Sequence, residues 1–270
     1  MSAVPAPSAF DTTSPRAQLL LVLADDELVT GHRASHWTGV APSLEEDLAF
    51  STIAQDEINH ADVWYQLLVG PVDDVRAAVD AVGLGREPGA YRHAIACERP
   101  PGDFAVTLAR HWAYDHADRL RLDALRRSTD DEVAAVATKL LHEERYHLEH
   151  ADHWFGRLAG GPDDHHERFG RALAAVLPEA LGLFEPPVGE ADAVADGLLP
   201  VGHAELRVRW ADALGGALEA AGYGELVVTL DGEVPADASG GRDGRHSTDF
   251  VDDVWPEMTA LYRAHPGARW

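Results

Sequence analysis

The sequence contains two similar stretches, EINHADVWYQLLVG at residues 57–70 and ERYHLEHADHWFGRLAG at residues 144–160. Each begins with Glu-x-x-His and ends with glycine, and apolar residues recur in both at spacings of three and four, which is typical of an amphipathic helix. Side chains at positions i and i+3 project from one face of a helix, close enough to bind the same metal ion. The two stretches therefore predict two helices with one pair of potential metal ligands each: Glu57 with His60, and Glu144 with His147.

The stretches also indicate an internal duplication, because residues 60–70 match residues 150–160. That match aligns at an offset of 90 residues, whereas the Glu-x-x-His motifs lie 87 residues apart. The two registers cannot both hold throughout. The histidine that corresponds to His60 in the second helix is therefore either His147 or His150. The alternative is that alanine, tryptophan, leucine and a final glycine are simply common residues at the end of a helix.

Helix-start signals arrange these stretches in two helical hairpins. Pro15 follows Ser14, and Ser43 and Glu46 form a capping box; Asp103 and the run 129–132 supply two further signals. The predicted helices span residues 15–38, 43–69, 103–127 and 130–158, with a less regular segment at 71–100 that includes a short helix near 72–82. Two hairpins joined by a crossover predict an all-α, ferritin-like four-helix bundle.

The signals weaken beyond Gly160. Helices are predicted near residues 166–183, 203–221 and 248–264, a short strand at ELVVTL (225–230), and a mobile or contact-ordered loop at 237–247. We therefore expect a tail at residues 1–14, a bundle at 15–160 and extra C-terminal helices at 161–270 that pack on the bundle within a single domain.

Carboxylates on the other two helices complete a metal-ligand set. Thirty residues before Glu57 lies Glu27, and 29 before Glu144 lies Asp115, each on an apolar stripe of its predicted helix. One acidic residue from each of two helices and a Glu-x-x-His from each of the others is the di-iron carboxylate arrangement, suited to two iron or manganese ions. The predicted ligands are Glu27, Glu57, His60, Asp115, Glu144 and His147. Asp26 and Asp118 are close competitors, and a vestigial site or a metal-free polar core are the alternatives.

The composition argues against several other functions. The chain has 46 acidic and 22 basic residues, and a net charge of −24 disfavours nucleic-acid binding. A single cysteine, Cys97, excludes an intramolecular disulfide and cysteine-based zinc or iron–sulfur sites. No apolar run approaches the roughly 20 residues that cross a bilayer, and residues 1–14 lack the features of a signal peptide. We therefore expect a cytoplasmic protein with no membrane or nucleic-acid partner.

Several further motifs resemble the C subunits of phenylacetyl-CoA epoxidases, the multicomponent oxygenases of phenylacetate degradation. The similar pieces are Trp37 with Ala41-Pro42, residues 45–49 (EEDLA), Asp103-Phe104-Ala105 with Ala109-Arg110, residues 145–148 (RYHL), residues 241–248 (GRDGRHST) and the terminal residues 266–270 (PGARW). The resemblance implies a ferritin-like subunit that pairs with a homologous catalytic A subunit and other oxygenase subunits. It also implies an acyl-CoA substrate and electrons from NADPH through a separate reductase subunit.

Two functions follow as hypotheses. The first is a subunit of a multicomponent di-iron monooxygenase that epoxidises phenylacetyl-CoA, with its own di-metal site. The rival is a non-catalytic scaffold that stabilises the A subunit and helps to form the acyl-CoA site, since such C subunits are regarded as having a degenerate metal site. Iron storage of the ferritin type is a third class, disfavoured by the C-terminal extension. Arg242, Arg245 and His246 are the predicted contacts to a partner or to CoA, and no catalytic residue is assigned.

Overall fold

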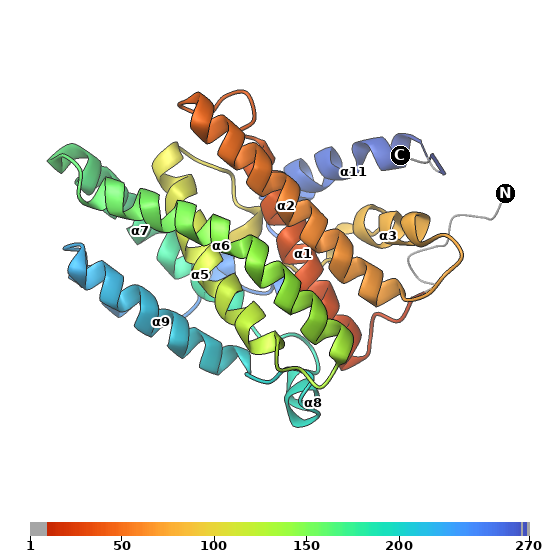
Figure 1. Cartoon of the computed structure of the whole chain (residues 1–270). Helices are drawn as coiled ribbons and strands as arrows, with labels where there is room; N and C mark the ends of the chain where they lie inside the picture. The colour runs from red at the N-terminus through yellow and green to blue at the C-terminus, as the bar shows by residue number, and fades with distance from the viewer. Residues whose placement is uncertain (1–9, 266, 269–270) are drawn as a thin grey trace. The chain divides into compact units, whose positions relative to one another are not determined.

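The computed structural model describes residues 10–265 and 267–268, and every regular element in this part of the chain is helical (Figure 1). This confirms the predicted all-α class. The chain folds as two compact units, which are described separately. Unit 1 comprises Met1–Pro100, Pro187–Ala193 and Gly240–Trp270, and unit 2 comprises Pro101–Pro186 and Val194–Ser239. These units divide the chain differently from the predicted bundle and extension. Residues 1–9 of the predicted tail, and Pro266, Arg269 and Trp270 of the terminal motif, lie outside the described residues.

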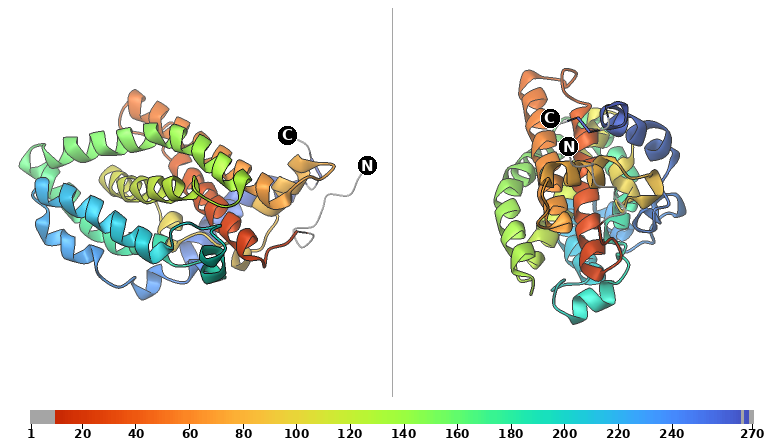
Figure 2. Two further views of the ribbon diagram at one scale, coloured as in Figure 1. Left: turned by 60° about the horizontal axis from the view of Figure 1, so that its bottom comes forward. Right: turned by 90° about the vertical axis from the view of Figure 1, so that its right-hand side faces the viewer.

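Unit 1 is built on a hairpin of two long helices that lie side by side (Figure 2). The Ser14 hydroxyl caps α1 by accepting from the Ala17 amide, and Ser43 caps α2 by accepting from the Glu46 amide, as the sequence predicts. Helix α2 ends at Gly70, whose φ of 63° favours glycine. The elements of this unit are α1 (Pro15–Ser35), α2 (Leu44–Val69), α3 (Val75–Leu84), η2 (Pro88–Ala90), α4 (Ile95–Glu98), η6 (Gly241–Asp243), the π-helical η7 (Asp249–Val254) and α11 (Trp255–Ala264).

Unit 2 contains the second predicted hairpin, α5 and α6. The Asp103 carboxylate caps α5 at the Val106 amide, and Asp130 caps α6 at two amides. Helix α9 packs on α5, where the Trp210 indole donates to the Ala113 carbonyl at 2.9 Å. The elements are α5 (Phe104–Leu125), α6 (Asp131–Ala159), α7 (Asp163–Ala180), η3 (Leu181–Phe184), α9 (His203–Ala220), η4 (Gly224–Leu226), α10 (Val227–Leu230) and η5 (Ala236–Ala238). The short helix α8 (Glu190–Ala195) spans a boundary between the units.

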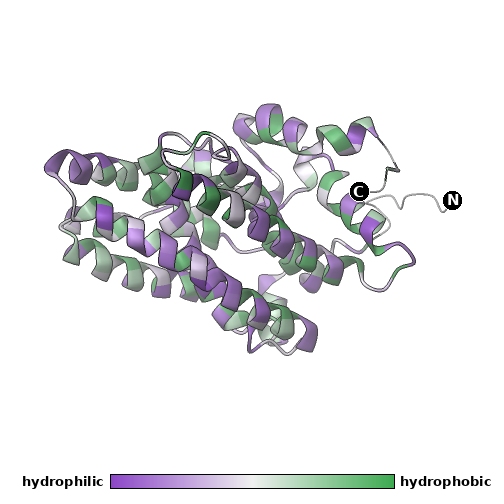
Figure 3. Ribbon diagram, turned by 45° about the horizontal axis from the view of Figure 1, so that its top comes forward, coloured by the Kyte–Doolittle hydropathy of each residue, from purple (hydrophilic) through white to green (hydrophobic). Residues whose placement is uncertain are grey.

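The two hairpins bury their helices to different extents. Helix α1 is buried on all sides over residues 19–29, whereas α6 buries a single stripe with the period of a helix. Figure 3 shows hydrophobic and hydrophilic residues alternating around the long helices, as such stripes require. Glu144 and His147 lie on the buried stripe of α6, among Leu140, Ala151 and Phe155. Both hairpins therefore place ionisable side chains among apolar ones.

One prediction about the C-terminal part is wrong, and a second element has more detail than predicted. The predicted strand at 225–230 is wrong, because these residues form η4 and α10, and α10 packs on α9. A short apolar run does not by itself distinguish a strand from a buried helical turn. The predicted helix at 248–264 begins as the π-helical η7 before α11. The loop 237–247 is ordered by contact, since Arg242 within it is buried.

No helix among the described residues is long and apolar enough to cross a bilayer.

Candidate metal centre

Three consecutive acids of α1, Asp25, Asp26 and Glu27, are all fully buried. Successive helical residues point about 100° apart, so the three carboxylates face different neighbours. Asp25 forms an ion pair with Arg86 through both carboxylate oxygens, and accepts from the Tyr65 hydroxyl at 2.5 Å. Burial, followed by the Asp25 charge, raises the pKa of Tyr65 well above its usual value, so this phenol stays a donor.

Asp26 faces a different guanidinium. Arg242 Nη1 and Nη2 donate to its two oxygens at 2.7 and 2.9 Å, and the Ala94 amide donates to the first at 2.9 Å. This bidentate pair joins α1 to the glycine-rich segment near the C-terminus. Asp26, a competitor of Glu27 in the sequence, therefore has a structural ion pair.

Glu27 faces α2, where it meets Glu57 and His60. One ligand atom from each of these three side chains lies within 4.8 Å of the others, and His60 Nδ1 is 3.9 Å from Glu27 Oε2. All three side chains are buried. The close approach of the helices depends on Gly31, because a Cβ at that position would lie 2.8 Å from Glu57 Cβ and 3.0 Å from the Ala54 carbonyl oxygen. The structure thus brings the first predicted carboxylate together with the first Glu-x-x-His.

Unit 2 holds the second predicted set on α5 and α6. Asp115, Glu144 and His147 are buried, and His147 Nδ1 lies 3.1 Å from Glu144 Oε1. His150, the candidate of the 90-residue register, is only partly buried. The spacing of the Glu-x-x-His motif therefore agrees better with the burial pattern of α6 than the repeat does.

His111 is a buried neighbour of this set that was not among the predicted ligands. Its Nε2 lies 3.3 Å from Asp115 Oδ2, and its ring centroid is 6.4 Å from that of His147. Burial, and then the neighbouring His150 and His147, lower the pKa of His111 well below its usual value, which favours the neutral ring that metals bind. Its spacing of four residues from Asp115 in one helix is the sequence signal that points to it.

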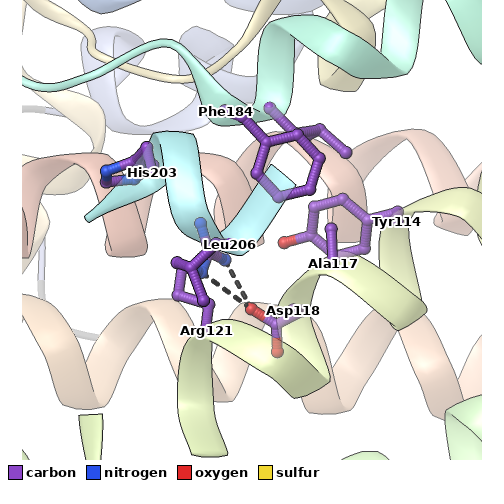
Figure 4. Close-up of a pocket in the computed structure, with 8 residues that line it drawn as sticks. Tyr114, Ala117, Asp118, Arg121, Phe184, His203 and Leu206 are labelled. Carbon is purple, nitrogen blue, oxygen red and sulfur yellow. Dashed lines mark hydrogen bonds and ion pairs between the residues drawn. The ribbon is translucent and has the colours of Figure 1, made fainter. Parts of the chain in front are cut away.

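Asp118, the competitor of Asp115, has its own partner. It accepts from Arg121 Nε at 3.0 Å beside a cavity of about 10 Å³, which Tyr114, Phe184 and His203 help to line (Figure 4). A cavity of that size has room for about one water molecule. Asp118 is thus committed to an ion pair in the same way as Asp26.

Each set has the chemistry of a metal site. Burying carboxylates costs several kcal/mol unless positive charge or hydrogen bonds offset it, and a divalent ion supplies such charge. Each set offers two carboxylates and an imidazole, donors that iron and manganese accept. The residues present therefore fit a carboxylate-rich metal centre.

The predicted partner contacts near the C-terminus differ in accessibility. Arg242 is buried in its pair with Asp26, and the His246 side chain is buried against Glu98, with Nδ1 at 3.1 Å from Oε2. Arg245 is exposed and pairs with Asp243. A contact with a partner or with CoA is open to Arg245, while the other two side chains are held by internal pairs.

Helical hairpins with buried carboxylate and histidine sets define the ferritin-like class. Comparison with known proteins agrees: the family model described as phenylacetic acid catabolic protein matches residues 5–270. The chain therefore belongs to the phenylacetic acid catabolic protein family. It is 30% identical over 254 residues to the C subunit of the 1,2-phenylacetyl-CoA epoxidase of Escherichia coli (strain K12), an alignment that covers 93% of this chain and 97% of that protein.

Proposed function

We propose that this chain is the C-type subunit of a multicomponent, cytoplasmic phenylacetyl-CoA epoxidase. The observation that carries the proposal is the similarity to the Escherichia coli C subunit over nearly the full length of both chains. An alignment of that extent includes the glycine-rich segment and both hairpins, and so covers every part of the chain that the proposal uses.

Co-purification with a homologous catalytic A subunit tests this function. We expect the two chains, expressed together, to elute as one complex in size-exclusion chromatography. The complex, with its reductase, should oxidise NADPH in response to phenylacetyl-CoA. Separate elution of two well-folded chains would contradict the proposal.

We propose further that Glu27, Glu57, His60, Asp115, Glu144 and His147 bind divalent metal ions, iron or manganese, up to two per chain. When bound, reduced iron supplies electrons and open coordination positions for oxygen. The role of this chain is to hold the ligands: Gly31 allows Glu57 to approach Glu27, and burial of the side chains keeps water from them. The rival function is a scaffold without metal, in which internal contacts such as the Asp25–Arg86 and Asp26–Arg242 pairs hold unit 1 together without any ion.

Metal analysis with two matched histidine variants separates these functions. His147→Ala should weaken the affinity for iron or manganese by at least about tenfold, because a buried ligand is lost. The helical content of the variant should stay unchanged. His150→Ala is the control and should bind metal as the unchanged chain does. If only His150→Ala lost metal binding, the alignment of the repeat at an offset of 90 residues would be supported instead. If the well-folded unchanged chain bound no metal, the scaffold function would be the one supported.

A further inference from the structure

We propose that His32, His36 and Glu257 form a second metal site, for a single divalent transition-metal ion of the zinc type. The site lies where the last turn of α1 meets the first turn of α11, both within unit 1. It shares no residue with the carboxylate-rich sets and does not depend on the proposed function.

The geometry matches a metal site built on one helix face. His32 lies in the last turn of α1, and His36 is the C-cap residue of that helix with right-handed helical backbone angles, so the two rings project from the same face one turn apart. Their Nε2 atoms lie 3.6 and 3.3 Å from the same oxygen, Glu257 Oε2, and all three atoms fall within 4.8 Å of one another. Zinc–ligand bonds of about 2.0–2.1 Å place neighbouring ligand atoms of a tetrahedral site about 3.3–3.4 Å apart. The observed separations are close to this edge length.

The two imidazoles direct their ligating atoms at this point. Within the described part of the chain, His32 Nε2 and His36 Nε2 make no hydrogen bond of normal geometry although both are shielded from solvent, and each lies in ion-pair range of Glu257 Oε2. Their rings pack edge to face at 5.1 Å between centroids. A shielded nitrogen without a hydrogen bond of normal geometry is unfavourable, and a bound ion would satisfy both nitrogens at once.

The donor set indicates which ion would bind. Two imidazole nitrogens and one carboxylate oxygen form the ligand set of zinc sites that keep an open fourth position. Magnesium and calcium prefer oxygen ligands, and among divalent ions of the first transition row the affinity for nitrogen donors rises from manganese toward copper. The side chain of Glu257 is 57% exposed, so an ion can enter from solvent and keep a water ligand.

A bound ion would also link two parts of the chain that are distant in sequence. Arg33 already reaches from α1 to η7, where Nη1 donates to Asp253 Oδ2 at 3.0 Å. Glu257 lies four residues beyond Asp253, and a metal bridge to His32 and His36 would add a second tie at the start of α11. Zinc should therefore stabilise the docking of α11.

Equilibrium dialysis with Zn²⁺, followed by metal analysis, tests the site on the full-length chain. The unchanged chain should bind one equivalent more than His36→Ala, and Glu257→Gln should weaken that equivalent by at least about tenfold. Co²⁺ in place of Zn²⁺ should give visible absorption bands of a four-coordinate ion, lost in both variants. Mg²⁺ should not compete.

His142→Ala is the matched control, since it removes a histidine of α6 that lies outside the buried stripe of that helix. A His60→Ala background separates this site from the carboxylate-rich set: the difference caused by His36→Ala should persist in it. Equal zinc stoichiometry and affinity in the unchanged chain, His36→Ala and Glu257→Gln would overturn the proposal. So would an equal loss in His142→Ala.

Discussion

Asp25 and Asp26 of α1 are each compensated by their own arginine, and the identity of the partner decides what a substitution does. Asp26 and Arg242 illustrate this, because both are almost inaccessible to solvent and are 216 positions apart in the chain. Removing one partner of a buried ion pair leaves the other charge uncompensated.

Arg242→Ala should therefore lower the free energy of unfolding by about 3–5 kcal/mol, measured by denaturant unfolding. Arg245→Ala, three positions away, removes the same guanidinium from an exposed side chain and should change it by about 0.5 kcal/mol or less. Similar losses in the two variants would show that the Asp26–Arg242 pair is not a buried structural contact.

A second buried cluster gives unit 1 a pH dependence. His93 Nε2 lies 2.7 Å from Glu98 Oε2, and the His93 and His246 rings stack at 4.1 Å. Burial, and then His246, lower the pKa of His93 to about 4 from 6.5, although Glu98 acts in the opposite direction. Burial raises the pKa of Glu98, but hydrogen bonds from His246 and His93 outweigh it and bring the value to about 2 from 4.5.

Both shifts have the same sign for stability. Between pH 6.5 and about 4 the unfolded chain binds a proton at His93 that the folded chain does not, so stability falls as the pH falls through this window. The depressed pKa of Glu98 removes further stability between pH 4.5 and about 2.

His93→Gln keeps a donor toward Glu98 but removes the ring that titrates, so its unfolding free energy should vary less between about pH 6.5 and 4.5. Denaturant unfolding of metal-free protein at several pH values measures the slope. His142→Gln is the control and should follow the unchanged chain; a slope for His93→Gln as steep as that of the control would disprove the role of His93.

At the scale of helices, the sequence predicts a feature correctly where neighbouring residues alone determine it. Ser14, Ser43, Asp103 and Asp130 all cap helices of the structure, because a cap depends only on the next few amides. The strand predicted at 225–230 is wrong for the opposite reason. The helical form of these residues comes with packing of α10 on α9, and no neighbouring residue in the sequence encodes that contact.

The spacing of α1 and α2 depends on one glycine. Gly31→Ala would place a Cβ 2.8 Å from Glu57 Cβ and 3.0 Å from a backbone oxygen, so the helices must separate. We expect a loss of about 1–3 kcal/mol in unfolding free energy, together with weaker metal binding, since Glu57 moves away from Glu27.

Gly156→Ala is the matched control, because Gly156 lies within α6 and a Cβ there would meet no described atom within 4 Å apart from its chain neighbours and the nearby backbone of its own helix. The added methyl should stabilise the chain by about 0.5–1 kcal/mol through its higher helix propensity. If both variants were stabilised, Gly31 would not be a close-approach position.

For the whole molecule, the sequence predicted which residue types form the candidate site better than it predicted what surrounds them. The i and i+3 rule selects Glu57 with His60 and Glu144 with His147 from a single helix each. Choosing Glu27 over Asp26 was not possible in this way, because adjacent acids differ only in the direction they face on α1. The partner that occupies Asp26 comes from the other end of the chain, where the segment 241–248 suggested a surface contact instead.

The net charge of −24 bears on assembly rather than on fold. Under the proposed function, an oxygenase that needs this chain should lose its activity without it.

Turnover of phenylacetyl-CoA by the A subunit and its reductase, with and without this chain, is the most direct test of the proposed function. We predict substrate-dependent NADPH oxidation and formation of the ring epoxide only when the chain is present. The Arg245→Ala variant tests in the same assay whether the exposed arginine contacts the partner or CoA, in which case turnover should fall. Equal epoxide formation in its absence would contradict the assignment of this protein as a working subunit of the epoxidase.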